Sequence, residues 1–216
     1  GIYFERTLIE IKYSGKIQEE QVIHLLNARG FDFEMVCERA NELRKQVSGD
    51  EVTYTVNRNI NYTNVCYFRC GFCAFSKGKM SENLRGKPYD LSLNEIVSRT
   101  REAWDRGATE VCLQGGIHPI YTGETYLRIC EAIHDSVPGV HIHAFSPLEV
   151  SHGANSLGLS IPDFIIKLRD SGLGTLPGTA AEILDDEVRQ IICPDKISTK
   201  EWLSIMQHAH QTGFRT

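Results

Sequence analysis

Apolar residues recur at helical spacing through the first fifty positions of the chain. The pattern predicts helices over residues 17–27 and 32–47, joined at Arg29 and Gly30. On one face of the second helix, apolar residues lie four, three and four positions apart, at Val36, Ala40, Leu43 and Val47. We therefore expect a helical hairpin that ends where Ser48 begins a short polar stretch.

From residue 52 onward, β-rich runs alternate with helical patterns. Strands are predicted over 52–56, 110–114, 140–145 and 174–179, and Phe214 would begin a fifth. Helices are predicted over 92–105, 124–136, 161–171, 181–191 and 199–211, with a glycine-rich loop over 152–160. Strands that alternate with helices of this length favour parallel pairing, as in a doubly wound sheet or a βα barrel. In either fold, functional residues gather at the carboxyl ends of the strands.

The composition excludes several classes of partner. The 216 residues are 41% hydrophobic and 24% charged, and the net charge of −5 comes without a basic stripe for nucleic acid. No run of about 18 apolar residues could span a membrane, and no secretory signal is recognisable. We expect small-molecule chemistry in the cytoplasm, without nucleic-acid or membrane partners. The chain begins with Gly1 and has no closing helix, so we also expect a fragment.

Three of the seven cysteines crowd into one short segment, at Cys66, Cys70 and Cys73. This crowding fits metal ligation better than a disulfide framework, because thiolates are soft ligands for iron–sulfur clusters and zinc. A cubane cluster has four irons, so three thiolates leave one iron open to an outside ligand. Gly71 would let the loop wrap closely around such a cluster.

A closed zinc site is the alternative for these cysteines. Structural zinc takes four ligands, but no histidine lies between His24 and His118 to complete the set. The remaining cysteines, which share no spacing with the three, are expected to be ordinary buried thiols: Cys37, Cys112, Cys130 and Cys193. The open iron–sulfur site is therefore the preferred interpretation.

Histidines and a glutamate near the predicted strand ends are further candidates. His118 and Glu149 lie beyond their strands and are candidate substrate contacts, with ordinary loop polarity as the alternative. His141 and His143 point to the same side of a predicted strand and would also suit a metal hydrolase. Since no further acidic and histidine set completes such a site, we prefer packing or substrate hydrogen bonds for this pair.

The segment from Cys66 to Cys73 resembles the signature of the radical S-adenosylmethionine (SAM) superfamily, with Phe72 at the aromatic position before the third cysteine. The resemblance implies that the three cysteines hold a 4Fe-4S cluster and that SAM binds its open iron. One electron from the cluster then cleaves SAM to a 5'-deoxyadenosyl radical. The implied fold is a partial TIM-type (βα)6 barrel, of which about four βα units are present here.

The same resemblance assigns cofactor-binding roles outside the cysteines. Gly115 and Gly116 resemble the glycine motif that holds the methionine amine, although a tight turn is an alternative. Thr179 and Glu182 lie where the superfamily often binds the ribose of the cofactor, although Thr179 could instead cap a helix. With Phe72, these residues form the predicted cofactor-binding set.

A closer resemblance covers nearly all of residues 57–213 and is to the second component of FO synthase, called CofH when it is separate from CofG. The segments that carry it are 59–64, 66–79, 114–119, 141–149, 176–189 and 192–196. It implies a transferase of deazaflavin coenzyme biosynthesis that joins the 4-hydroxybenzyl group of L-tyrosine to 5-amino-6-(D-ribitylamino)uracil. The implied partners are a CofG-type component, separate or fused, and a one-electron donor.

This resemblance also divides the chain. Residues 1–51 would be an N-terminal helical extension or the joint behind a CofG half, and residues 52–216 a radical SAM core truncated at its C-terminus. Two alternatives remain open. One is a radical SAM enzyme of futalosine-type menaquinone synthesis, in which the cysteine loop is similar, and the other is a non-catalytic iron–sulfur or zinc-binding module.

Overall fold

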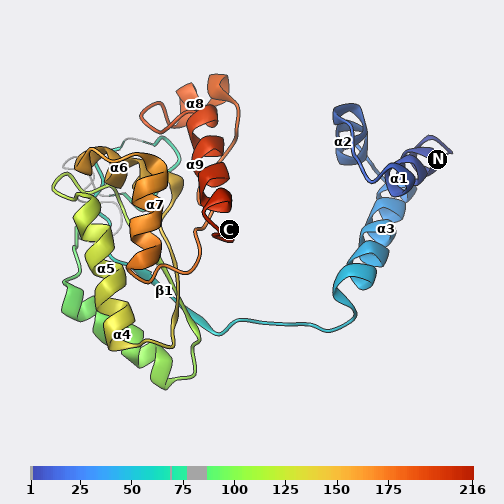
Figure 1. The fold of residues 1–216 in the computed structure, drawn as a ribbon. Coiled ribbons are helices and arrows are strands. Elements are labelled where there is room, and N and C mark those ends of the chain that lie inside the picture. Colours follow the sequence, from blue (N-terminus) through green and yellow to red (C-terminus); the bar gives the residue numbers. More distant parts are fainter. Residues whose placement is uncertain (1, 69, 77–86) are drawn as a thin grey trace. The chain divides into compact units, whose positions relative to one another are not determined.

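The computed structural model of the protein describes residues 2–68, 70–76 and 87–216 (Figure 1). The chain divides into two compact units, Gly1–Tyr54 and Thr55–Thr216, which are described separately here. The sequence placed this division between residues 51 and 52. Among the described ranges, no helix has the length and apolar character needed to cross a membrane.

The first unit consists of helices α1 (Ile2–Ser14), α2 (Glu19–Leu26) and α3 (Phe31–Ser48). The predicted hairpin of α2 and α3 is confirmed, and Gly30 allows the turn between them because its φ of 57° suits glycine. Helix α1 was not predicted. It contacts both other helices, and the Phe4 ring stacks on His24 at a centroid distance of 3.9 Å.

The predicted apolar face of α3 is not a buried face of this unit. Val47 is 77% exposed and Leu43 is also exposed, and α3 has no buried residue. Within the described side chains of the unit, only Thr7 and Ala28 are buried. Helical spacing predicted the helix correctly, but the two short neighbouring helices cover little of its length.

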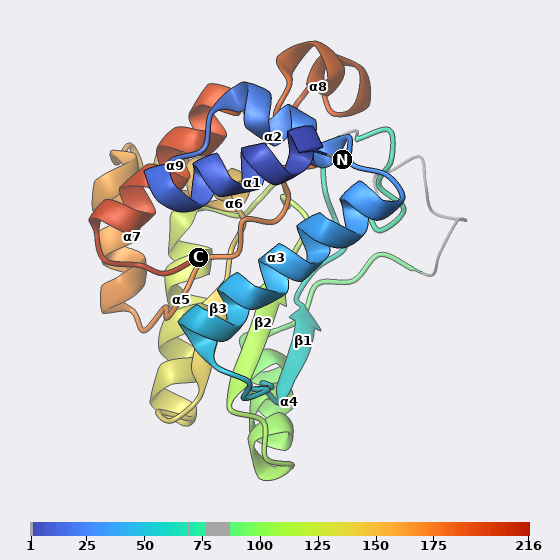
Figure 2. The same cartoon turned by 90° about the vertical axis from the view of Figure 1, so that its right-hand side faces the viewer.

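The second unit contains a parallel sheet of β1 (Asn57–Asn61), β2 (Glu110–Gln114) and β3 (His141–Ala144), in that spatial order (Figure 2). Strands β2 and β3 lie where the sequence predicted them. The prediction for the first strand was wrong. Residues 52–56 are exposed and do not belong to a strand. The ladder between β1 and β2 begins only at Asn57, opposite Glu110, the first residue of β2. The strand therefore starts where its neighbour starts, although residues 52–56 alternate like a strand.

Helices in the connections complete the second unit: α4 (Leu93–Asp105), α5 (Gly123–Ser136), α6 (Pro147–Leu157), α7 (Ile161–Asp170), α8 (Asp186–Ile192) and α9 (Thr199–Gln211). The predictions of α4, α5, α7 and α9 are confirmed. A predicted capping box begins α4, where Ser92 Oγ accepts a hydrogen bond from the Glu95 backbone.

Two helix predictions need correction. The glycine-rich loop expected over 152–160 is largely helix α6, because Ser146 and Glu149 form a capping box and the helix then runs to Gly158, whose φ is 65°. Helix α8 begins five residues later than residue 181. Its N-cap is Asp185, whose carboxylate accepts a hydrogen bond from the Val188 backbone at 3.1 Å.

The predicted fourth strand, over 174–179, and the fifth, from Phe214, each take part only in isolated β-bridges. Thr175 forms parallel bridges to His143 on one side and to Arg215 on the other, so both segments continue the order of the sheet beyond β3. Helix α4 packs against α5, α5 against α6 and α6 against α7, and α7 then packs against α9. The arrangement is the βα repeat that the sequence predicted.

Strand alternation gives the sheet two chemically different faces. Ile60, Leu113 and Ile142 point to one side and are buried in the hydrophobic core beneath the helices. The residues on the other side are polar or weakly polar and only partly covered: Asn57, Asn59, Asn61, Glu110, Cys112, Gln114, His141 and His143. At the carboxyl ends of the strands, this polar face lies beside the loops that follow them, since Gln114 at the end of β2 lines the same cavity as the cysteine loop.

Candidate cofactor site

A cavity of about 210 Å³ lies at the carboxyl ends of the strands and brings together most of the predicted site residues. Its lining includes the three cysteines Cys66, Cys70 and Cys73, and the predicted cofactor-binding residues Phe72, Gly115, Gly116, Thr179 and Glu182. Glu149, predicted as a substrate contact, also lines it, together with Lys196, which was not predicted as a site residue. These residues are spread over more than a hundred positions of the chain and meet only in the fold.

The cysteine loop follows β1 and is held by backbone hydrogen bonds to two other connections. The Tyr67 N–H donates to Ile117 O at 3.1 Å, beyond β2, and the Gly71 N–H donates to Ile192 O at 2.8 Å, at the end of α8. Cys66 and Cys70 are half-buried, and Cys73 is exposed. Arg69 and residues 77–79 of the segment that carries the sequence resemblance lie outside the described residues.

The donor set fits a cluster with one open iron. The three thiols line the same cavity. Among the described residues, no three Cys, His, Asp or Glu side chains are placed so that they could hold a single metal ion. A structural zinc ion would need four ligands, whereas a 4Fe-4S cluster spreads its thiolates over separate irons. The residues present therefore fit the cluster better than a mononuclear zinc site.

The surroundings of the Cys70 thiol change its pKa. Burial raises its pKa to about 11, the positive charge of Lys196 opposes this rise, and charge on Cys73, Cys193 and Cys66 adds to it. Without bound metal, Cys70 is therefore protonated at neutral pH. Binding of a metal or cluster at this thiol releases that proton.

The glycine pair after β2 is required by the close approach of the cysteine loop. A Cβ atom at Gly116 would lie 2.3 Å from Val65 O and 2.8 Å from Cys66 Cβ, and one at Gly115 would lie 2.3 Å from the Tyr62 ring. The Gly116 N–H also donates to Thr63 O at 2.9 Å. The pair thus fixes the distance between the first two strand-end loops, while its contact with a cofactor stays a prediction.

By contrast, Gly71 has room for a side chain. A Cβ atom there would meet only Ile192 O, at the ordinary contact distance of 3.6 Å. The described residues around Gly71 therefore do not explain why the loop carries glycine at that position.

Glu149 occupies a different setting from the loop that the sequence suggested. It lies in the first turn of α6 and is 2% exposed. Its carboxylate accepts hydrogen bonds from the Tyr62 hydroxyl, from the Ser146 backbone N–H at 2.6 Å and from the Gly115 backbone N–H. Burial raises the pKa of Glu149, and these hydrogen bonds oppose the rise. A substrate contact by Glu149 stays a prediction.

His118 lies beside the cavity but outside its lining. Its ring stacks on Tyr121 at a centroid distance of 4.9 Å, and its Nδ1 accepts a hydrogen bond from the Ile120 backbone at 3.3 Å. The side chain is only partly covered. A substrate contact by His118 also stays a prediction.

Thr179 and Glu182 line the cavity and do not cap a helix, since Asp185 is the N-cap of α8. Glu182 has a φ of 52° and forms an ion pair with Lys196 at 2.6 Å. The ammonium group of Lys196 also lies 5.5 Å from the centroid of the Phe72 ring. Sequence reasoning missed Lys196 as a site residue, although it ends the segment 192–196 that carries part of the family resemblance.

His141 and His143 share a hydrogen-bond partner. Both rings hydrogen-bond with Thr175 Oγ1, at 2.8 and 2.6 Å, and burial lowers the pKa of His143. Glu110 Oε2 lies 4.0 Å from His141 Nε2, and packing or substrate hydrogen bonds stay the prediction for the histidine pair. Of the four cysteines expected to be buried, Cys130 and Cys193 are, whereas Cys112 is half-buried and Cys37 is exposed.

Comparisons with known proteins agree with this geometry. The family model described as "Radical SAM superfamily" matches residues 60–216. The chain is similar to "FO synthase" of Streptomyces coelicolor, with 45% identity over 201 residues, which are 93% of this chain and 23% of that protein. It is also similar to "5-amino-6-(D-ribitylamino)uracil--L-tyrosine 4-hydroxyphenyl transferase" of Methanococcoides burtonii, with 44% identity over 96% of this chain and 55% of that protein. The chain thus spans about half or less of the length of these relatives.

Solved structures provide a comparison of the fold alone. Methylornithine synthase (PylB) matches with a TM-score of 0.70 and 18% identity, over 96% of this chain and 56% of its own. HydG, a maturase of the [FeFe]-hydrogenase, matches with a TM-score of 0.69 and 16% identity, over 98% of this chain and 44% of its own. Together with the family match, these likenesses confirm the predicted α/β fold, a partial TIM-type (βα)6 barrel of the radical SAM kind.

Proposed function

The chain belongs to the radical SAM superfamily, and we propose that Cys66, Cys70 and Cys73 hold a 4Fe-4S cluster whose open iron binds SAM in the adjoining cavity. The observation that carries this proposal is the meeting of the three thiols with Gly115, Gly116, Thr179 and Glu182 around one cavity. When bound, the cluster and SAM supply the electron transfer and the reactive radical that start catalysis.

The protein's own contribution is orientation and exclusion of water. Backbone hydrogen bonds hold the cysteine loop against the connections after β2 and α8, so the thiols face the cavity from a braced loop. Gly115 and Gly116 line the cavity, and the Tyr62 ring and Val65 O take the space that their side chains would occupy, so the two glycines let the first strand-end loop pack tightly at this wall. Phe72 provides an aromatic surface beside it for a planar group.

For the overall reaction, we propose the transfer that the Methanococcoides relative is named for. In this proposal the full protein joins the 4-hydroxybenzyl group of L-tyrosine to 5-amino-6-(D-ribitylamino)uracil, a step of deazaflavin coenzyme biosynthesis. High identity over nearly all of this chain to that relative and to FO synthase supports it. A CofG-type component and a low-potential one-electron donor are the proposed partners.

The polar face of the sheet is the proposed surface for the substrates. Gln114 lines the cavity and belongs to the same face as Cys112 and Asn59, which lie opposite one another in the ladder, so the cofactor site and this face are continuous. His143 and Thr175 extend the face beyond β2. Amide, imidazole and hydroxyl groups can bond the carbonyl, amine and ribityl hydroxyl groups of an aminouracil. His118 and Glu149 remain the proposed contacts above this surface.

Two measurements on the full-length, anaerobically reconstituted protein test the proposal. We expect about four irons per chain, as a 4Fe-4S cluster requires, and formation of 5'-deoxyadenosine that depends on L-tyrosine. Cys70→Ser should abolish both the cluster and SAM cleavage. Cys37→Ser is the matched control, because Cys37 is an exposed thiol of the first unit.

The outcomes separate the alternatives. Product analysis with L-tyrosine and the ribitylaminouracil should give the coupled product. Turnover of a futalosine-related substrate instead would redirect the proposal to menaquinone synthesis. Zinc in place of iron, or a cluster whose electron paramagnetic resonance spectrum is unchanged by SAM, would point to a non-catalytic module.

A further inference from the structure

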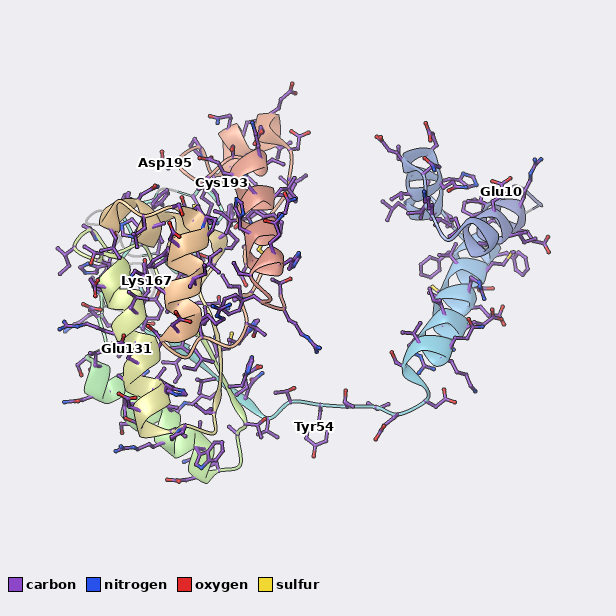
Figure 3. All side chains as sticks on the ribbon, viewed as in Figure 1. Glu10, Tyr54, Glu131, Lys167, Cys193 and Asp195 are labelled. Carbon is purple, nitrogen blue, oxygen red and sulfur yellow. The ribbon has the colours of Figure 1, made fainter. Side chains whose placement is uncertain are left out.

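A single positive charge lies in the wall of the cofactor cavity. Among the described residues that line this cavity, Lys196 is the only lysine or arginine. Its side chain is 15% exposed. Lys196 follows the end of α8 in the sequence, where Figure 3 labels the preceding residues Cys193 and Asp195. A lysine so largely removed from water costs free energy unless nearby groups compensate its charge.

The contacts of Lys196 join the two sides of the cavity. Its ammonium group pairs with Glu182 at 2.6 Å, in the loop that follows Thr175, and lies 5.5 Å from the centre of the Phe72 ring. Phe72 stands between Cys70 and Cys73 in the cysteine loop. The lysine is therefore in contact with the loop that carries the thiols as well as with the loop that carries Glu182.

Glu182 lies close to two cations. Its side chain is 12% exposed and lies between Lys196 and the buried Arg189, whose guanidinium is 3.9 Å away. The Arg189 guanidinium donates hydrogen bonds mainly to the backbone, at the carbonyl oxygens of Ala181, Ile183 and Ile197. Hydrogen bonds from Thr199 and the charge of Arg189 lower the pKa of Asp186, so a second carboxylate accompanies Arg189. Lys196 is the cation of this group that reaches the cysteine loop, through the Phe72 ring.

We propose that the positive charge of Lys196 favours the reduced form of the cluster held by Cys66, Cys70 and Cys73. This inference rests on the proposed cluster. Reduction adds one electron, supplied by a low-potential donor, and a partly buried cation stabilises that added charge more than an exposed one does.

The test is the midpoint potential of the reconstituted full-length protein, titrated with dithionite and followed by electron paramagnetic resonance. Lys196→Gln should shift the potential to more negative values, and Lys196→Arg should keep it near that of the wild type. Lys167→Gln is the matched control, because it removes the same charge from the exposed side of α7 (Figure 3). It should leave the potential unchanged.

A charge-balanced pair separates electrostatics from packing. Glu182→Gln should shift the potential to more positive values, and the double variant Lys196→Gln/Glu182→Gln should return it toward that of the wild type. If Lys196 acted only by holding the loop in place, the double variant would be at least as perturbed as the single one. That result, or equal potentials for Lys196→Gln and Lys167→Gln, would overturn the inference.

Two failures remain distinguishable. A wild-type protein that assembles no cluster contradicts the proposed function itself. If the wild-type cluster forms but its midpoint potential is the same in Lys196→Gln and Glu182→Gln, only the role of Lys196 is contradicted. If Lys196→Gln alone assembles no cluster, the comparison of the double variant with Glu182→Gln still decides the inference: a more negative potential in the double variant supports the role of Lys196, and equal potentials overturn it.

Discussion

The Tyr62 hydroxyl donates a hydrogen bond to the Glu149 carboxylate, and both side chains are buried at the edge of the sheet that carries the cofactor site. Tyr62 directly follows β1, whereas Glu149 belongs to the first turn of α6, after β3. The Gly115 N–H, which follows β2, donates to the same carboxylate. One side chain therefore connects the ends of three neighbouring strands, and with them the cysteine loop and the glycine pair.

Tyr62→Phe should destabilise the second unit. The substitution removes the hydroxyl but keeps the ring, so a buried carboxylate loses one of its donors. We expect a loss of about 1–3 kcal/mol in the free energy of unfolding, measured by urea denaturation. Tyr54→Phe is the control, since Tyr54 is almost fully exposed, and it should change stability by less than about 0.5 kcal/mol. Equal stabilities for the two variants would contradict a structural role for this hydrogen bond.

Glu149→Gln should change the pH dependence of stability in a defined direction. Burial raises the pKa of Glu149 in the folded protein, so the folded state binds this proton more tightly than the unfolded state. The contribution of Glu149 to stability therefore falls as pH rises from about 4.3, the usual value for glutamate, through the raised folded pKa.

The difference in unfolding free energy between wild type and Glu149→Gln, measured from pH 4 to pH 8, isolates this contribution. We expect the wild type to lose stability relative to the variant as pH increases over that interval. A difference that grows in favour of the wild type would mean that the hydrogen bonds to the carboxylate outweigh its burial.

Gly116→Ala should prevent proper assembly of the cluster site. The added methyl group would overlap Val65 O and Cys66 Cβ, both in or beside the cysteine loop, so the loop must move. We expect a clear fall in iron content and in the visible absorbance of the reconstituted protein, with helical content retained in far-ultraviolet circular dichroism. Gly71→Ala is the comparison, because its methyl group meets only one atom at 3.6 Å. Normal cluster content in Gly116→Ala would rule out this steric requirement.

In the cluster-free protein, Cys73 should react with iodoacetamide before Cys70. Cys73 is exposed, whereas Cys70 is half-buried and its pKa is raised to about 11, so little of it is thiolate at neutral pH. The alkylation rate of Cys70 should rise about tenfold per pH unit between pH 7.5 and pH 10. Mass spectrometry of the modified peptides measures both rates. A Cys70 rate that is independent of pH in this range would contradict the raised pKa.

Local patterns in the sequence determined most elements of the second unit. The capping box of Ser92 and Glu95 and the apolar runs of β2 and β3 act over a few residues, so their positions could be predicted without knowledge of the fold. The spacing of Cys66, Cys70 and Cys73 likewise predicted soft metal ligands on one loop, and that assignment stays a proposal.

Only the tertiary structure decided where the first strand begins and what Glu149 and Lys196 contact. Residues 52–56 alternate like a strand, but the ladder starts at Asn57 because its partner on β2 starts at Glu110. Glu149 is buried because Tyr62 and Gly115, distant in sequence, donate to it, and Lys196 enters the site through Glu182 and Phe72. Burial and charge pairing depend on which segments meet in space, and that information lies in long-range contacts rather than in any local pattern.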